Sequence, residues 1–565
     1  MTMISVNRPL DCVLSVIAIR YRLLAIPATI SPMSEPLISL HFVDYLVVLA
    51  YLAATLLIGL WFSRTIHSQS DFFLAGRSLP WWAVGFSLVA TDIGGTDIVG
   101  LGGATNQYGI AAANFDWIGC IPAMLVGAFV FIPHFWRCGI TTIPELLERR
   151  FDYRVRTAVS LSWFLFMACN LGVMLVASAR FMSGLAGWSP WLSICVVACL
   201  VAIYTYSGGL AAVIYTDVLQ GVIMIVGCLF VTIAGYIEIG GWSNLEQAVN
   251  QSLAEQAAPD LASPPPEPFT ALGATHFDLI LPVDTPSPWP WPAILFGLLF
   301  VVSPAYWIGN QCIVQRSLAA RSEYEAKASY VWGALLKNVI PVVVVLPGLM
   351  AVARYPYLEN RDQALPRMVG AALYPGFRGI FVAAFLAALM SSVDSYLNSA
   401  TTLFTHDFYK RFWRPLADDR RLLAIGRIVT ILLTVWSIFF AFLLLPLDAG
   451  VYAIFQTLLS FIQGPALAVL LSGLLSRRAN SGAAFFGFLI GVATAFGLFL
   501  MSLEEFCRII GTTRLFQRDD PFLYYSIWAF LASIIVIVIG SYLNPPEPEE
   551  KLKYVISRRR LEAAS

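Results

Sequence analysis

Charged side chains are scarce in this sequence. Asp, Glu, Lys and Arg make up 12% of its 565 residues, whereas 58% are hydrophobic, and the mean hydropathy is +0.74. A water-soluble chain of this length needs more polar residues to cover its surface. An excess of charge of one sign is also missing, because 35 basic residues balance 35 acidic ones, which argues against a nucleic acid partner. The composition therefore indicates a membrane protein.

The cysteine and histidine patterns of metal sites are missing as well. The nine Cys include no CxxC pair, and none of the five His stands at zinc-ligand spacing. Most of the cysteines lie in apolar runs, so we interpret them as small core residues. No nucleophile–base pair or nucleotide-binding loop stands out, so we expect neither an enzyme nor an organic cofactor.

Long apolar runs recur along most of the chain. A helix that crosses a lipid bilayer needs about 20 such residues, and the runs predict an all-α, polytopic membrane protein with about thirteen spans. The predicted spans begin near Phe42, Trp81, Ala112, Val155, Trp188, Ala211, Pro292, Tyr330, Gly376, Leu422, Gly450, Ala483 and Phe522. We expect one transmembrane domain over 39–545, with a core at about 80–475.

Both ends of the chain and one loop are predicted to differ from the spans. Residues 1–38 contain a short apolar segment interrupted by two Arg, which predicts a leader-like or unstructured N-terminus, or an upstream translation start before Met33. A Pro-rich, acidic stretch within 240–291 predicts an extended external loop. Residues 546–565 are predicted to form a cytoplasmic tail.

The basic residues predict the orientation in the cell membrane. With the N-terminus outside, the segment from Gly240 to Pro292, which has no Lys or Arg, faces outwards, and the C-terminus is cytoplasmic. The predicted cytoplasmic set is Arg64, Arg77, Arg137, Arg149, Arg150, Arg154, Arg156, Arg316, Arg321, Lys327, Lys410, Arg411, Arg414, Arg420, Arg421, Arg427, Arg477, Arg478, Lys551, Lys553, Arg558, Arg559 and Arg560. This set outnumbers the basic residues of the predicted outer side.

The span at residues 86–103, FSLVATDIGGTDIVGLGG, combines Asp92 and Asp97 with five Gly. Ionisable residues inside a span are costly and usually mark functional sites. Such a run predicts a broken helix, whose free backbone carbonyls suit a bare cation. The alternative, glycine for tight helix packing, leaves the two Asp unexplained.

A second span, LLFVVSPAYWIGNQ at 298–311, carries Pro304 and Gly309 on either side of Tyr306 and Trp307. Proline removes a backbone donor, so we expect a kink or an unwound turn there. Two interrupted spans suggest inverted repeats with a site at the middle of the membrane. The aromatic pair suits stacking on a sugar ring or closing the site, and packing between helices is the alternative.

Hydroxyl side chains gather in a third span, AALMSSVDSYLNSATTLFTHDFYKRF at 387–412. In a helix, Ala388, Ser391, Ser392 and Ser395 share one face. Their hydroxyl and carbonyl oxygens are hard ligands, which suit Na⁺ better than a soft metal. Contact between two helices is the alternative explanation.

Two more ionisable residues lie inside predicted spans, Asp217 in GGLAAVIYTDVLQGVIMIVG and Lys337 in YVWGALLKNVIPVVVV. A buried Lys needs a carboxylate or backbone carbonyls, and Asp116 in NFDWIG is a candidate partner. The alternative for Lys337 is that it extends to the membrane interface.

Four segments carry a resemblance to a known family: DFFLAGRSLPWW, GGLAAVIYTDVLQ, QCIVQRSLAA and SSVDSYLNSATTLFTHDFYKRF. From about Asp44 to about Leu500, the sequence resembles the sodium:solute symporters, and among them the sodium/glucose cotransporters. The resemblance implies a leucine-transporter-type fold. In this fold two inverted five-helix repeats form the core, with one helix before it and further helices after it.

The resemblance also implies ion sites. The residues implied for a Na⁺ site are Ala90, Ile93 and Ala388, through their carbonyls, and Ser391 and Ser392, through their hydroxyls. The residues implied for a second Na⁺ or an ion path are Asp217, Ser391, Asp394 and Ser395. A carboxylate at Asp394 would strengthen cation binding or take up a proton.

For the solute, the implied residues are Asp92, Asp97, Asp116, Ser303, Tyr306, Trp307, Lys337 and Gln456. Tyr306 stands at the inner gate position of the family, and Lys337 and Gln456 match sugar-binding positions. Asp92 stands where sugar carriers usually have Asn, and Asp97 where His or Gln is common. Carboxylates can accept hydrogen bonds from sugar hydroxyls, and they also suit an amino sugar or a cationic solute.

We therefore expect a Na⁺-coupled symporter that imports a sugar-like solute by alternating access, as a monomer or weak oligomer in the lipid bilayer. Three alternatives stay open. The solute could be myo-inositol, a sialic acid or an amino sugar. Protons could be the coupling ion, through Asp217 or Asp394. A non-transporting sugar sensor is the third, although it would normally need a cytoplasmic output domain.

Overall fold

The computed structural model describes residues 38–256, 275–285, 287–355, 358, 361–446, 451–516 and 521–556. Within these ranges the secondary structure is helical, apart from two isolated bridges. The predictions for residues 1–37, for 257–274 of the external loop and for 557–565 of the tail lie outside the described residues.

The helices follow one another from α2 to α23. Their bounds are α2 (Phe42–Phe62), α3 (Gln69–Leu74), α4 (Trp81–Asp92), α5 (Gly95–Tyr108), α6 (Ile121–Val126), α7 (Ile132–Cys138), α8 (Ile143–Arg150), α9 (Tyr153–Ala186), α10 (Pro190–Ile239), α11 (Trp242–Gln256), α12 (Ser303–Gly309), α13 (Gln311–Leu318), α14 (Glu323–Leu336), α15 (Leu346–Arg354), α16 (Ala364–Ala372), α17 (Phe377–Leu403), α18 (Asp419–Leu444), α19 (Val451–Leu475), α20 (Ser481–Leu500), α21 (Glu504–Ile510), α22 (Phe522–Leu543) and α23 (Glu549–Leu552). Wider π-helical turns at Phe115–Cys120, Gly127–Phe131, Ala293–Val302, Pro341–Val345 and Phe404–Trp413 adjoin several of them.

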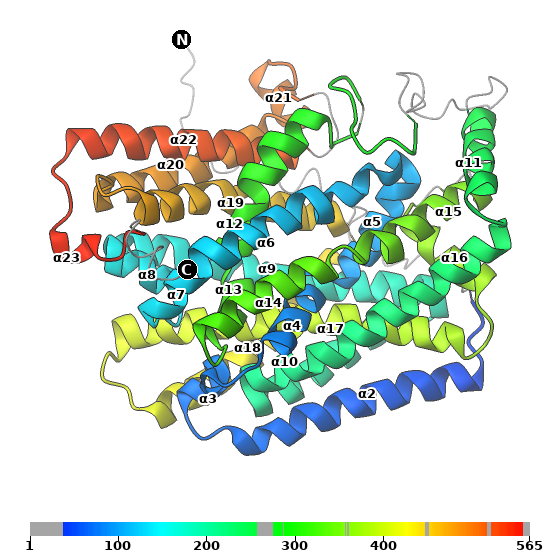
Figure 1. Ribbon diagram of the computed structural model, residues 1–565, viewed down its shortest axis with the longest axis horizontal. Helices are drawn as coiled ribbons and strands as arrows, with labels where there is room; N and C mark the ends of the chain where they lie inside the picture. Colours follow the sequence, from blue (N-terminus) through cyan, green and yellow to red (C-terminus); the bar gives the residue numbers. More distant parts are fainter. Residues whose placement is uncertain are drawn as a thin grey trace, which may run out of the picture.

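Most of the long helices run side by side along the longest axis of the molecule (Figure 1). Helix α2 lies at one edge, against α10 and α17, and α22 lies at the opposite edge, against α19 and α20. In the described residues, ten helices are long and apolar enough to cross a membrane, and two bent helix pairs raise that number to as many as twelve. The predicted multi-pass architecture is therefore confirmed.

Helix α10 covers two of the predicted spans. Its 50 residues would extend about 75 Å as one straight helix, whereas the apolar part of a bilayer is about 30 Å thick. Gly209 interrupts the helix with φ +53° and ψ −149°. This turn divides α10 into 190–208 and 210–239, the regions where the sequence predicts separate spans from Trp188 and Ala211.

Both spans that were predicted to be interrupted are broken. Helices Trp81–Asp92 and Asp97–Ala113 meet at 55°, and Ala293–Gly309 meets Gln311–Leu318 at 49°. The second break lies at Asn310, which caps α13 by accepting a 2.9 Å hydrogen bond from the Cys312 amide. Pro304 lies within the continuous helical stretch Ala293–Gly309, where the π-helical turns Ala293–Val302 pass into α12, and the sharp bend comes after Gly309.

Helix α17, with its hydroxyl residues, forms the centre of the bundle and is the most completely buried of the membrane-spanning helices in the described residues. The segment 240–291 begins with a helix, α11, which packs on α15 and precedes the Pro-rich stretch that is predicted to be extended. The described part of the tail packs on the protein: the Ile556 amide donates to the Leu474 carbonyl at 2.8 Å.

Gly209→Ala should lower the thermal stability much more than Gly139→Ala. Both glycines have positive φ, +53° and +63°, so alanine at either position costs about 1–2 kcal/mol of backbone strain. At Gly209 a Cβ would also lie 2.5 Å from the Phe72 carbonyl oxygen, whereas nothing lies within 4 Å at Gly139. Thermal unfolding of both variants in detergent tests this, and equal shifts would contradict a close approach at Gly209.

Candidate functional site

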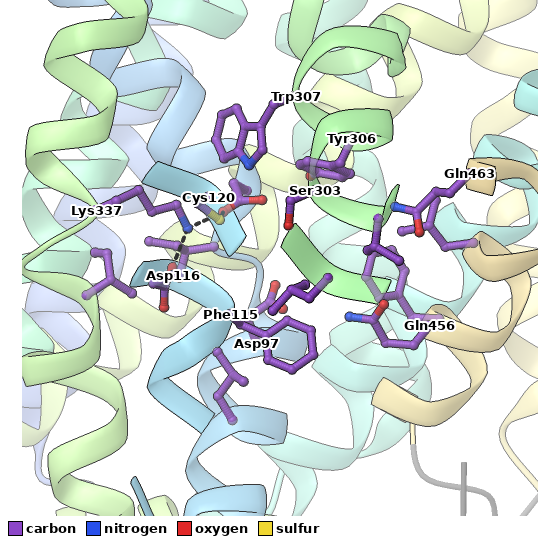
Figure 2. Close-up of a pocket in the computed structure, with 18 residues that line it drawn as sticks. Asp97, Phe115, Asp116, Cys120, Ser303, Tyr306, Trp307, Lys337, Gln456 and Gln463 are labelled. Atoms are coloured by element: carbon purple, nitrogen blue, oxygen red, sulfur yellow. Dashed lines mark hydrogen bonds and ion pairs between the residues drawn. The ribbon is translucent and has the colours of Figure 1, made fainter. Parts of the chain in front are cut away.

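A cavity of about 80 Å³ lies between the two broken helices and α19. Every residue that the sequence analysis assigned to the solute lines it: Asp92, Asp97, Asp116, Ser303, Tyr306, Trp307, Lys337 and Gln456. Figure 2 shows Lys337 and Asp116 on one side of this cavity, Gln456 and Gln463 on the other, and Ser303 and Tyr306 between them. Residues far apart in the chain thus meet at one place.

The Lys337 side chain reaches into the cavity and does not extend to the membrane interface. Its exposed fraction is 2%, and its ammonium group lies 2.6 Å from Asp116 Oδ1. The predicted pairing with Asp116 is therefore confirmed. Asp92, at the end of α4, forms a second ion pair with the same ammonium group, which the sequence analysis did not foresee.

Three acidic residues, Asp92, Asp97 and Asp116, line the same cavity as Lys337. Asp97 Oδ2 accepts a 2.9 Å hydrogen bond from the Gly94 amide. Asp92, Asp116 and Cys120 lie close enough together to hold a metal ion. Lys337, however, already pairs with both carboxylates, so an ion pair accounts for this group without a metal.

The wall of the cavity opposite Lys337 is formed by α12 and α19. Gln456 and Gln463 of α19 line it together with Tyr306, and Gln463 Nε2 is buried with no hydrogen-bond partner in the described part of the chain. The sequence analysis missed Gln463. It follows Gln456 by seven residues, which is two helical turns, so that spacing was the available signal.

The first predicted ion site is built where the end of α4 meets α17. Ser391 Oγ donates to the Ala90 carbonyl at 2.8 Å and lies 3.0 Å from the Ala388 carbonyl. Ser392 Oγ donates to the Thr91 carbonyl at 3.0 Å and lies 3.2 Å from Ala388 O. These oxygens are buried and uncharged, a hard donor set that fits Na⁺.

Ile93, whose carbonyl the resemblance implies as a ligand, directly follows α4 as its C-cap residue. Ser392 Oγ also reaches the Thr91 carbonyl, which the sequence analysis did not name. The last carbonyls of a helix lack intrahelical partners, so the break after Asp92 is what makes these oxygens available.

The residues predicted for a second ion or an ion path lie on the other side of Thr91. Ser395 Oγ is 2.9 Å from Thr91 Oγ1 and donates to Asp394 Oδ1 at 2.9 Å. Asp217 Oδ2 accepts from Ser87 Oγ at 2.5 Å. The structure thus brings Asp217, Asp394 and Ser395 close to the first ion site.

Arg316 also lies in this region, which corrects the sequence analysis. We had placed it among the cytoplasmic loop cations, but it is completely buried in α13 and pairs with Asp217. Tyr204, which donates to Asp394 Oδ2 at 2.6 Å, was not identified either. Their position inside a predicted span was the signal in the sequence that could have indicated them.

Two broken helices around a central cavity, in a bundle of membrane-spanning helices, are the architecture of secondary transporters. The chain belongs to the sodium:solute symporter family, which matches residues 72–491.

Named relatives cover most of this chain. The sodium/glucose cotransporter 4 of Mus musculus is 32% identical over 546 residues, 92% of this chain and 78% of the relative. The sodium/glucose cotransporter of Vibrio parahaemolyticus is 32% identical over 540 residues, 90% of this chain and 92% of the relative.

A solved structure of a Na⁺-coupled sialic acid symporter, in a substrate-bound outward-open state, matches with a TM-score of 0.73 and 24% identity. The match covers 90% of this chain and 99% of that one. It confirms the predicted leucine-transporter-type fold.

Lys337→Met should destabilise the protein by about 3–5 kcal/mol, because it leaves Asp92 and Asp116 buried without their counter-charge. Adding Asp116→Asn to this variant should recover part of the lost stability, because it removes one of the two carboxylates that are left without a counter-charge. A double-mutant cycle on thermal unfolding measures this coupling, with Lys553→Met on the exposed tail as the control. Purely additive losses would contradict the pairing.

Proposed function

We propose that this protein is a Na⁺-coupled symporter that imports a sugar or sugar-like solute by alternating access. The observation that carries the proposal is that the end of α4 belongs to both sites. Asp92 lines the solute cavity, while the Ala90 and Thr91 carbonyls accept from the serines of α17. The relatives named sodium/glucose cotransporters support the same function.

Sodium would bind among the carbonyls of Ala90, Ile93 and Ala388 and the hydroxyls of Ser391 and Ser392. The hydroxyl hydrogens that point at carbonyls would turn away, so that the oxygens ligate the ion. The ion would then join α4 to α17 and fix the position of Asp92 beside the solute. Because binding linkage is reciprocal, solute would raise the Na⁺ affinity by the same factor.

The driving force is the inward Na⁺ gradient together with the membrane potential, which adds about 2.3 kcal/mol per charge per 100 mV. On the solute side, the amides of Gln456 and Gln463 and the ammonium of Lys337 donate hydrogen bonds to hydroxyl oxygens, and the carboxylates accept from hydroxyl hydrogens. Tyr306 and Trp307 supply apolar faces.

The remaining features of the proposal follow from the sequence. We propose a multi-pass protein of the cell membrane with its N-terminus outside and its C-terminus in the cytoplasm, acting as a monomer or weak oligomer. The family consists of transporters, and the proposal includes neither enzymatic activity nor an organic cofactor.

An inward Na⁺ gradient should stimulate uptake of labelled glucose into proteoliposomes, and Ser392→Ala should abolish most of this stimulation because it removes one ligand oxygen. Ser437→Ala is the matched control, since Ser437 is buried in α18 and its hydroxyl donates to the Thr434 carbonyl of its own helix. Uptake that does not change with the Na⁺ gradient would contradict sodium coupling and favour protons as the coupling ion, through Asp217 or Asp394.

An amino sugar is a second candidate solute, because three acidic residues but one lysine line the cavity. In competition assays Asp97→Asn should weaken binding of glucosamine at least tenfold more than binding of glucose, since only glucosamine loses a charge partner. Equal losses for the two sugars would contradict a cationic solute and favour a neutral one.

A further inference from the structure

A second cavity, of about 260 Å³, lies apart from the solute site. Its walls come from the start of α8, the start of α9 and the π-helical turns Phe404–Trp413 that continue α17. The ionisable residues that line it are Glu145, Arg156, His406, Lys410 and Arg411. Cations outnumber acids here, whereas acids outnumber the lysine in the solute cavity.

Acids that do not line this cavity hold two of its cations in place. Arg156 lies 2.5 Å from Asp407 Oδ1 and 2.6 Å from Glu148 Oε2. Arg411 donates to Glu148 Oε1 through Nε at 2.8 Å and through Nη2 at 2.7 Å. A guanidinium has five N–H donors, so the Arg411 side chain is fixed at the wall and keeps donors for a ligand.

Lys410 carries a charge that none of these acids neutralises. It takes part in no ion pair within the described ranges, whereas Glu145 already pairs with Arg149 at 2.5 Å. The whole cluster has four cations and three acids: Arg149, Arg156, Lys410 and Arg411 against Glu145, Glu148 and Asp407. One positive charge is therefore left over, and it belongs to a residue that lines the cavity.

His406 adds a buried polar group that lacks a partner. Its side chain lines the cavity with an exposed fraction of 9%, and its Nε2 has no hydrogen-bond partner in the described part of the chain. A buried polar atom without a partner costs free energy, so a ligand that bonds to Nε2 gains by removing this cost. A neutral imidazole can donate one N–H, as an acceptor ligand requires.

We propose that this cavity binds an oxyanion of the phosphate type, held by Lys410, His406 and the remaining N–H groups of Arg411. Phosphate oxygens are strong acceptors, and lysine and arginine are the side chains that commonly bind them. The anion neutralises the surplus charge and gives His406 a partner. Na⁺ would add to the surplus charge, and a neutral sugar would leave it uncompensated.

The anion would join two parts of the bundle. Lys410 and Arg411 follow α17, the helix that carries the serines of the candidate Na⁺ site, whereas Arg156 belongs to α9. In the proposed orientation this end of the bundle faces the cytoplasm. Free phosphate and the headgroups of anionic phospholipids both offer the required chemistry there.

Equilibrium binding of radioactive inorganic phosphate to the delipidated full-length protein, at constant ionic strength, tests the proposal. We expect one phosphate per chain. Lys410→Gln should weaken binding about tenfold or more, because a charged donor is lost, and Lys410→Arg should keep most of the affinity. Arg414→Gln removes the same charge, but Arg414 is exposed and does not line the cavity, so this control should bind as the wild type does.

A second probe, labelled dihexanoyl phosphatidic acid, identifies the source of the phosphate group. Tighter binding of this lipid than of inorganic phosphate would indicate a headgroup, and equal binding would indicate free phosphate; both results support the site. Failure of the wild type to bind either probe would overturn the proposal, whether or not the variants fold. Equal losses in Lys410→Gln and Arg414→Gln would overturn it too, since they would indicate unspecific attraction. The coupling ion and the solute are independent of every one of these results.

Discussion

A charge inside a membrane protein has to be compensated within a few ångströms, because neither lipid nor a packed core supplies water to solvate it. Two of the buried cations meet this constraint at the centre of the bundle. Lys337 holds Asp92 and Asp116 together, and Arg316 pairs with Asp217. Each pairing joins different helices, so the charges determine which helices meet at the centre. The cavity and the oxygen-lined ion site lie at these meeting points.

The helix breaks supply the second requirement, which is polar backbone at membrane depth. An unbroken helix uses its carbonyls internally and offers nothing to a cation. The break after Asp92 leaves the last carbonyls of α4 without intrahelical partners, and the serine hydroxyls of α17 donate to them. Larger residues on that face of α17 would keep the backbone of α4 too far away for these contacts, which run between 2.8 and 3.0 Å.

The sequence predicted features that depend on composition along one segment. Glycine and aspartate in one apolar span indicated a break, and a lysine with no nearby charge in its own segment indicated a partner elsewhere, Asp116. Features that depend on where a particular carbonyl or side chain points in the folded protein were not predictable. The sequence does not encode which carbonyl of a helix end points at Ser392, so Thr91 was missed.

Arg316 illustrates the same limit. A basic residue near the end of an apolar run has the same pattern whether it lies at the membrane surface or in the core. Only the three-dimensional arrangement of α4, α10, α13 and α17 shows that acceptors surround it. The second break falls beside Gly309, within the predicted stretch 298–311, whereas the helix continues through Pro304.

The end of α4 explains why ion and solute would depend on each other. A helix C-terminus carries a partial negative charge equivalent to about half an elementary charge, and Asp92 adds a full one at the same place. Lys337 compensates this carboxylate from the cavity side, whereas a cation among the Ala90 and Thr91 carbonyls would compensate the helix end from the other. A solute that draws Lys337 away from Asp92 therefore increases the negative potential felt by the ion. Bound Na⁺ in turn lowers the cost of loosening that ion pair, so each ligand favours the other without any direct contact between them.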